Sequence, residues 1–202
     1  MRSRHVRLTI AVIGALASSA PSPRIFGIQL APGFKRLPKD PVAGVMYGNN
    51  AGSPQTSEIG FNFTFIVLPP GWPVSLTLGT SYASSSQRLG AGLDETAHTS
   101  EVGVGARKTV VHGPVRAFGG AGLALCSLEV KDQYVGQGYM TWVGAGSGGF
   151  LEAGAAWRIK EIVDVGLTVR YSNFWSDRFP VQKARYWDAG GLFGGLLVGY
   201  GP

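Results

Sequence analysis

The sequence predicts an all-β fold, an eight-stranded antiparallel up-and-down transmembrane β-barrel, from three observations. Apolar residues alternate with small or polar residues along several segments, which is the period of a β-strand. The links between these segments are alternately short and long, as in barrels with tight turns at one end and loops at the other. Beyond its N-terminal region, the sequence has no apolar stretch of the roughly 20 residues that a spanning helix needs.

Residues 1–20 have the pattern of a secretory signal peptide. Arg2, Arg4 and Arg7 precede an apolar stretch over residues 8–17, and small residues follow it. These arginines are among 18 basic residues, so the formal net charge of +6 is partly a feature of the export signal. The other Lys and Arg residues form no run that could follow a phosphate backbone, which argues against a nucleic-acid partner.

Residues 21–40 contain four prolines, and we expect them to form an irregular lead-in to a barrel domain over residues 41–202. The alternative is that residues 24–30 form the first strand. The predicted strands cover residues 41–48, 58–67, 74–83, 101–111, 115–130, 143–159, 163–173 and 188–200.

The second and third predicted strands show the alternation most clearly. From Ile59 to Val67 the odd positions are apolar, whereas Glu58, Asn62 and Thr64 on the other parity are polar. The third strand alternates Val, Leu and Leu with Ser, Thr and Gly over residues 74–79. One face of each strand is therefore apolar, and the other is small or polar.

The links separate the later strands in the same alternating way. Short links occupy residues 68–73, 112–114 and 160–162, and each contains proline, glycine or a charged turn. The long links are expected over residues 49–57, 84–100, 131–142 and 174–187. The last strand is rich in glycine and ends in Tyr200, which is similar to the terminal aromatic signal of outer-membrane barrels.

In a barrel that lies in lipid, the apolar parity faces outward and the polar parity fills the lumen. The inward parity carries four acids and four bases, namely Glu58, Glu101, Glu152, Asp164, Arg107, Arg116, Arg158 and Arg170. Charges in a narrow lumen must be paired or reach water, so this balance predicts an internal salt-bridge network and not an ion-selective ring. An eight-stranded barrel has room for side chains but not for an open channel.

The last short turn predicts which of these charges lie opposite one another. A register centred on Glu161 places Arg158 opposite Asp164 and, in the same register, Glu152 opposite Arg170. We therefore expect cross-strand contacts within both pairs.

Aromatic residues lie near both ends of the predicted strands, where a membrane interface favours amphipathic rings. At the turn end they are Trp72, Trp157 and Tyr200, and at the loop end they are Tyr82, Trp142, Tyr171, Trp175 and Trp187. The alternative is that aromatic residues end strands in many β proteins.

The chain resembles the small eight-stranded outer-membrane β-barrel superfamily, which includes the porin-like surface antigen barrels. The likeness rests on residues 102–107, 117–122 and 165–171 and on the glycine-rich last strand. It implies a location in the bacterial outer membrane, contact with outer-membrane lipids and lipopolysaccharide, and assembly by the barrel assembly machinery.

Two segments contain groups that could act in catalysis. Residues 170–173 resemble the His-x-Ser-Asn stretch of the lipid A deacylase family, but Arg170 replaces the histidine and cannot act as a general base. His98, Ser100 and Glu101 supply a base, a hydroxyl and a carboxylate in one short segment, which is not by itself the geometry of a triad. The single Cys126 has no cysteine or histidine at metal-ligand spacing, and we expect neither a metal nor a cofactor.

These observations favour a non-enzymatic outer-membrane barrel with a packed, charged lumen. Its role would be structural, or it would bind an extracellular ligand through its loops. Three alternatives remain: a narrow pore or carrier for a small apolar solute, a lipid-modifying barrel enzyme, and a soluble lipocalin-like binder.

Overall fold

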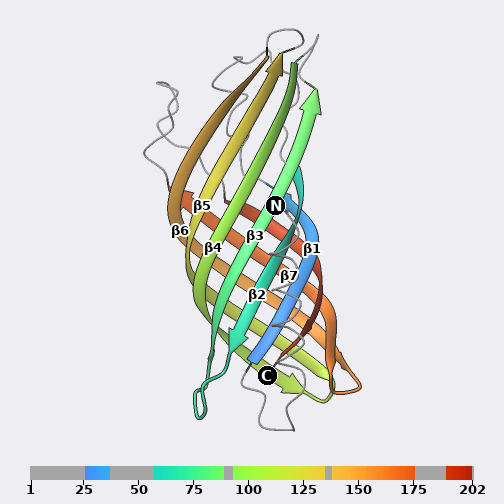
Figure 1. The fold of residues 1–202 in the computed structure, drawn as a ribbon. Helices are drawn as coiled ribbons and strands as arrows, with labels where there is room; N and C mark the ends of the chain where they lie inside the picture. The colour runs from blue at the N-terminus through green and yellow to red at the C-terminus, as the bar shows by residue number, and fades with distance from the viewer. Residues whose placement is uncertain (1–25, 37–56, 89–92, 135–137, 176–189, 202) are drawn as a thin grey trace, which may run out of the picture.

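The protein is a closed barrel in which eight strands pair in sequence order and the last strand pairs with the first (Figure 1). The computed structural model describes residues 26–36, 57–88, 93–134, 138–175 and 190–201. The strands are β1 (Phe26–Arg36), β2 (Ser57–Val67), β3 (Ser75–Arg88), β4 (Leu93–His112), β5 (Val115–Tyr134), β6 (Gly138–Ile159), β7 (Val163–Trp175) and β8 (Gly191–Tyr200). All neighbouring pairs are antiparallel, so the predicted fold class is confirmed. Within these ranges, no helix is long and apolar enough to cross a membrane.

The first strand differs from the prediction. β1 lies inside residues 21–40, which we expected to be an irregular lead-in, and the strand expected over 41–48 falls outside the described residues. The alternative first strand over 24–30 was closer to the structure. β1 alternates like its neighbours, with Pro32 outward between Leu30 and Phe34. Because proline has no backbone N–H, the pairing with β8 is interrupted at Ala31 and Pro32, whereas the pairing with β2 continues.

The hairpins β3–β4 and β5–β6 are much longer than predicted. β4, β5 and β6 have 20, 20 and 22 residues, whereas β8 has 10, and Figure 1 shows β3 to β6 rising beyond the other strands at one end. Residues 84–100 and 131–142, expected as loops, therefore lie mostly in strands. Their outward positions are polar, so the apolar alternation ends before the strand pairing does.

The turn between β6 and β7 determines the register of that hairpin. Lys160 and Glu161 have positive φ angles of 48° and 58°, and the Ile162 N–H donates to the Ile159 carbonyl at 3.0 Å. Arg158 is the Cα partner of Asp164, and Glu152 is the partner of Arg170, which is the expected register.

The two faces of the sheet differ sharply in chemistry. Outward side chains form an apolar belt, in which Leu123 is 71% exposed and Phe34 is 66% exposed. Inward positions bury charged and hydroxyl side chains together with a few aromatic rings. The polar side of the barrel is thus its interior, and the interior is where the candidate site lies.

Candidate functional site

The part of the lumen nearest the long strands, here called the upper lumen, holds a cluster of buried charges around Glu101 of β4. The Lys35 Nζ donates to Glu101 Oε1 at 2.7 Å and to Thr99 Oγ1 at 3.3 Å. Thr99 in turn donates to Glu58 Oε2 at 2.8 Å. Three strands, β1, β2 and β4, therefore supply one hydrogen-bonded chain of buried groups.

Arg170 of β7 joins this cluster from the other side of the lumen. Its Nη2 lies 3.3 Å from Glu101 Oε2, and Ser172 donates a 3.0 Å hydrogen bond to Glu101 Oε1. The guanidinium carbon lies 3.8 Å from the centre of the Phe150 ring. Glu101 thus has two cations and a hydroxyl around it in a site closed by an aromatic face.

A second charged group lies around Arg107. Its Nε donates to Glu152 Oε1 at 2.7 Å, and its Nη1 donates to the side-chain oxygen of Gln29. The guanidinium carbon lies 4.2 Å from the centre of the Phe118 ring. Phe118, like Phe150, therefore lies against an arginine.

A third group lies at the end of the barrel with the short turns. Arg158 makes a two-point contact with Asp164, with distances of 2.8 Å and 2.9 Å from Nε and Nη2. Arg116 Nη1 is 3.5 Å from Asp164 Oδ2. Both arginines also donate to the carbonyl of Gly201, at 2.6 Å from Arg158 and 3.1 Å from Arg116.

Glycines make room for the lumen side chains. A Cβ built at Gly122 would lie 2.6 Å from the Phe150 ring, and one at Gly154 would lie 2.3 Å from the Phe118 ring. Real Cβ contacts are not this short, so these glycines are needed for the two rings to lie across the lumen. A cavity of about 20 Å³ beside Arg107, Arg116 and Asp164 has the size of a single water site. The lumen is packed with side chains over this part of its length.

All eight charged residues assigned to the lumen from parity point inward, and seven of them are buried. Arg158 and Asp164 contact each other as expected. Glu152 and Arg170 lie opposite each other in the lumen as expected, but the ion pairs join Glu152 to Arg107 and Arg170 to Glu101. Long side chains reach across a narrow lumen, so a Cα neighbour need not be the ion-pair partner.

Lys35, Phe118 and Phe150 belong to the site but were not among the predicted residues. Lys35 is 1% exposed and adds a base to the expected four. Because the prolines predict irregular structure for residues 21–40, the sequence alone does not place Lys35 in the lumen, although its parity within β1 is the signal that identifies it. The two phenylalanines have inward parity in strands with small residues around them, which was the available signal.

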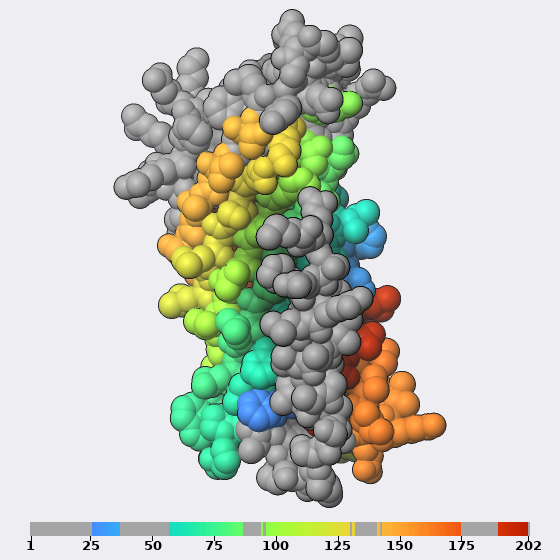
Figure 2. All heavy atoms as spheres, viewed as in Figure 1, coloured from blue at the N-terminus to red at the C-terminus, as the bar shows by residue number. Residues whose placement is uncertain are grey.

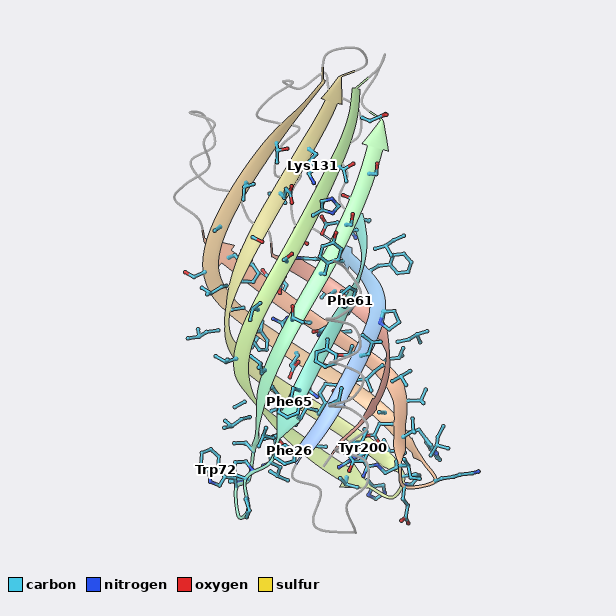
Figure 3. All side chains as sticks on the ribbon, viewed as in Figure 1. Phe26, Phe61, Phe65, Trp72, Lys131 and Tyr200 are labelled. Atoms are coloured by element: carbon cyan, nitrogen blue, oxygen red, sulfur yellow. The ribbon has the colours of Figure 1, made fainter. Side chains whose placement is uncertain are left out.

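The aromatic residues expected at the membrane interfaces lie mainly on the outer surface. Trp72, Trp157, Tyr171 and Tyr200 are exposed, and Figure 3 shows Trp72 and Tyr200 at the same end of the barrel as Phe26. Tyr82 is partly exposed, and its ring contacts both Phe61 and His98, each with ring centres 5.9 Å apart. The side chains of Trp142 and Trp175, and the whole of Trp187, lie outside the described part of the structure.

The two candidate catalytic segments do not form a triad among the described residues. His98 and Ser100 have outward parity on β4, whereas Glu101 points into the lumen. The His98 Nδ1 is 2.8 Å from the Tyr82 hydroxyl. Ser172 also points inward and donates to Glu101, so it takes part in the lumen cluster.

Comparison with solved structures places this geometry among known barrels. The neisserial surface protein A matches with a TM-score of 0.54 and 15% sequence identity, covering 88% of this chain and 97% of that one. The chain has the fold of the small eight-stranded outer-membrane β-barrels.

Two further structures support the same fold. A major outer membrane protein from Thermus thermophilus matches with a TM-score of 0.57 and 13% identity, covering 88% of this chain and 98% of that one. Ail, the attachment invasion locus protein of Yersinia pestis, matches with a TM-score of 0.52 and 12% identity, covering 87% of this chain and 95% of that one. No protein-family model and no curated protein sequence matches the chain.

Proposed function

We propose that this chain is a non-enzymatic β-barrel protein of the bacterial outer membrane, with a rigid, filled lumen and a surface-binding or structural role at its long-strand end. The observation that carries the proposal is the apolar belt around the closed barrel. Outward apolar positions run from Phe26 to Phe34 on β1, from Ile59 to Val67 on β2 and from Val163 to Tyr171 on β7. Each run matches the roughly 9–11 residues with which a tilted strand crosses a bilayer.

The packed lumen supports a role outside transport. Ion pairs at three levels join β1, β4, β5, β6 and β7, and the rings of Phe118 and Phe150 lie against two of the arginines. A carrier for a small apolar solute would need an apolar passage, whereas these groups are charged and mutually paired. The interior is therefore suited to holding the wall rigid.

The long hairpins provide the surface that would meet a partner. Above the apolar belt, the outward side chains become polar, as at Ser86, Asp94, Thr96 and Lys131. Binding residues placed on such rigid strands keep their geometry better than residues on loops. Ail, which has the same fold, has also been crystallised in complex with the heparin analogue sucrose octasulfate, so this scaffold can carry a ligand. Outer-membrane lipids, lipopolysaccharide and the barrel assembly machinery are the partners implied by the location.

The first experiment is expression of the full chain with its own N-terminal segment, followed by outer-membrane fractionation. We expect the protein in that fraction, and we expect boiled and unboiled samples to migrate differently on a detergent gel because the closed barrel resists unfolding. Release as a soluble periplasmic protein with unchanged mobility would overturn the proposal.

A further inference from the structure

The outer surface has a groove that crosses β4, β5 and β6 within the apolar belt. Its volume is about 630 Å³, and the outward residues lining it are Val102, Val104, Leu123, Leu125, Ser147 and Gly149. This volume lies within the roughly 300–1,000 Å³ of small-molecule sites. In Figure 2, the outward side chains of β5 and β6, coloured yellow to orange, form the upper left flank of the molecule.

The groove exists because tall and short side chains lie side by side. Leu123 and Leu125 on β5 are 71% and 67% exposed, so they stand out from the wall. Their partners on β6 are Gly149 and Ser147, which rise little above the backbone. A Cβ built at Gly149 would meet no atom closer than the Gly122 carbonyl oxygen at 3.5 Å. The space above Gly149, at the floor of the groove, is therefore unoccupied.

The upper end of the groove changes from apolar to polar within one row of residues. The next outward positions above Val102 and Leu125 are Ser100 and Ser127, which are Cα partners. One row further, His98 lies opposite Glu129, and its Nδ1 contacts the Tyr82 hydroxyl at 2.8 Å. The groove thus has apolar walls and a rim of hydroxyl, imidazole and carboxylate groups, in which Glu129 forms an ion pair with Lys131.

We propose that this groove binds one acyl chain of a membrane lipid, with the polar linkage of that chain at Ser100 and Ser127. The inference rests on the proposed location in a membrane. An acyl chain fits the site because its hydrocarbon matches the leucine and valine walls, while its ester or hydroxyl group needs hydrogen-bond partners where the apolar belt ends. The rim lies on the side of the long hairpins, so the lipid belongs to the leaflet at that end.

The test compares two glycine substitutions that add the same apolar side chain to the belt. Gly149→Leu fills the groove. Gly194→Leu is the matched control, because Gly194 faces outward on β8, and a Cβ there meets nothing within 4 Å. Each full-length variant is incorporated into vesicles of dipalmitoyl phosphatidylglycerol and extracted into mild detergent. Native mass spectrometry then measures the retained lipid.

We expect the parent protein and Gly194→Leu to retain one lipid and Gly149→Leu to retain at least tenfold less. Replacing both Ser100 and Ser127 with Ala is expected to lower retention as well. If Gly149→Leu does not assemble, Ser147→Leu fills the same groove from the neighbouring outward position. Equal retention by the filled and control variants would overturn the inference, and so would a dimer that the filling substitution dissociates, because the occupant would then be a second copy.

Membrane fractionation of the parent protein tests the proposed function independently of lipid binding in the groove. A heat-modifiable barrel in the membrane that retains no lipid would overturn the groove assignment alone. Absence from the membrane fraction would overturn both.

Discussion

Glu101 is the residue on which the upper lumen cluster depends most. It accepts hydrogen bonds from Lys35 and Ser172 and lies against the guanidinium of Arg170. Its side chain is 2% exposed, so water contributes little to its stabilisation. Loss of one charge in such a site leaves the opposite charges buried without compensation, which is more costly than the net value of the pair.

Glu101→Gln is expected to lower the free energy of unfolding by about 3 kcal/mol, because Lys35 and Arg170 would lose their shared anion. Urea unfolding in lipid vesicles, followed by loss of the heat-modifiable band, measures the change. Glu129→Gln is the control, since the ion pair of Glu129 with Lys131 is 39% and 46% exposed. It should change stability by less than about 1 kcal/mol. Equal effects of the two substitutions would contradict a structural role for the buried cluster.

Parity identified the lumen charges but could not identify all of their partners. A side chain's direction follows from its place in a strand, and the sequence therefore indicates that Glu152 and Arg170 point inward. Their partners depend on how far flexible side chains extend across the lumen. Arg170 forms an ion pair with Glu101, and Glu152 forms one with Arg107, although Glu152 and Arg170 are Cα partners in the sheet.

The β6–β7 hairpin carries a turn whose residues are not those that its backbone favours. Two successive positive φ angles belong to a type I′ turn, in which Asn and Gly are preferred. Here Lys160 and Glu161 occupy these positions. The short turn holds Arg158 opposite Asp164, and the two side chains form a two-point ion pair. This ion pair compensates for the backbone strain in the turn.

Glu161→Gly should raise the free energy of unfolding by about 0.5–1 kcal/mol, because glycine adopts positive φ without steric cost. The same urea titration measures it. Gly113→Ala in the β4–β5 turn is the converse substitution, at a φ of 58° with no atom within 4 Å of the added Cβ. It should destabilise the protein by about 1 kcal/mol. A loss of stability in Glu161→Gly would show that the turn is not strained.

The sequence predicted seven of the eight strands because their outward residues alternate within the apolar belt. It failed where that signal was weak. In β1, the prolines of the surrounding segment suggested irregular structure, although Phe26, Ile28, Leu30 and Phe34 keep the alternation. In the extended part of the β3–β4 hairpin, the residues around Ser84 and Ser86 are polar or small on both faces, and pairing continues through backbone hydrogen bonds that side-chain hydrophobicity does not report.

At the scale of the whole molecule, the belt and the lumen reverse the arrangement of a soluble protein. Large apolar side chains cover the outside, and paired charges fill the inside. The hydrophobic effect therefore acts between the wall and its surroundings more than within the barrel. The proposed membrane location accounts for this arrangement, because hydrocarbon would then surround the belt.

Leu167→Arg tests whether the middle of the apolar belt lies in the centre of the bilayer. Leu167 is 62% exposed and lies at the middle of the outward apolar run on β7, so the arginine is expected to cost about 2–4 kcal/mol in lipid vesicles. Val163 lies at the lower edge of the same run, and Val163→Arg should cost only about 0–1 kcal/mol. Urea unfolding in vesicles compares the two variants. Equal costs would mean that the strand does not cross the hydrocarbon in the orientation proposed.

The unequal strand lengths have a further consequence for the backbone. β6 pairs with β7 only as far as Ser147, and β2 pairs with β3 only as far as Ser84. Among the described strands, the part of β6 from Gly138 to Gly146 has a neighbour on one side alone, which is β5. Within the described strands, the main-chain N–H and C=O groups on its other side have no strand partner, which is the geometry of a sheet edge, and the register of this segment is set by β5 alone. Within the belt, by contrast, the sheet closes on itself and offers no such edge.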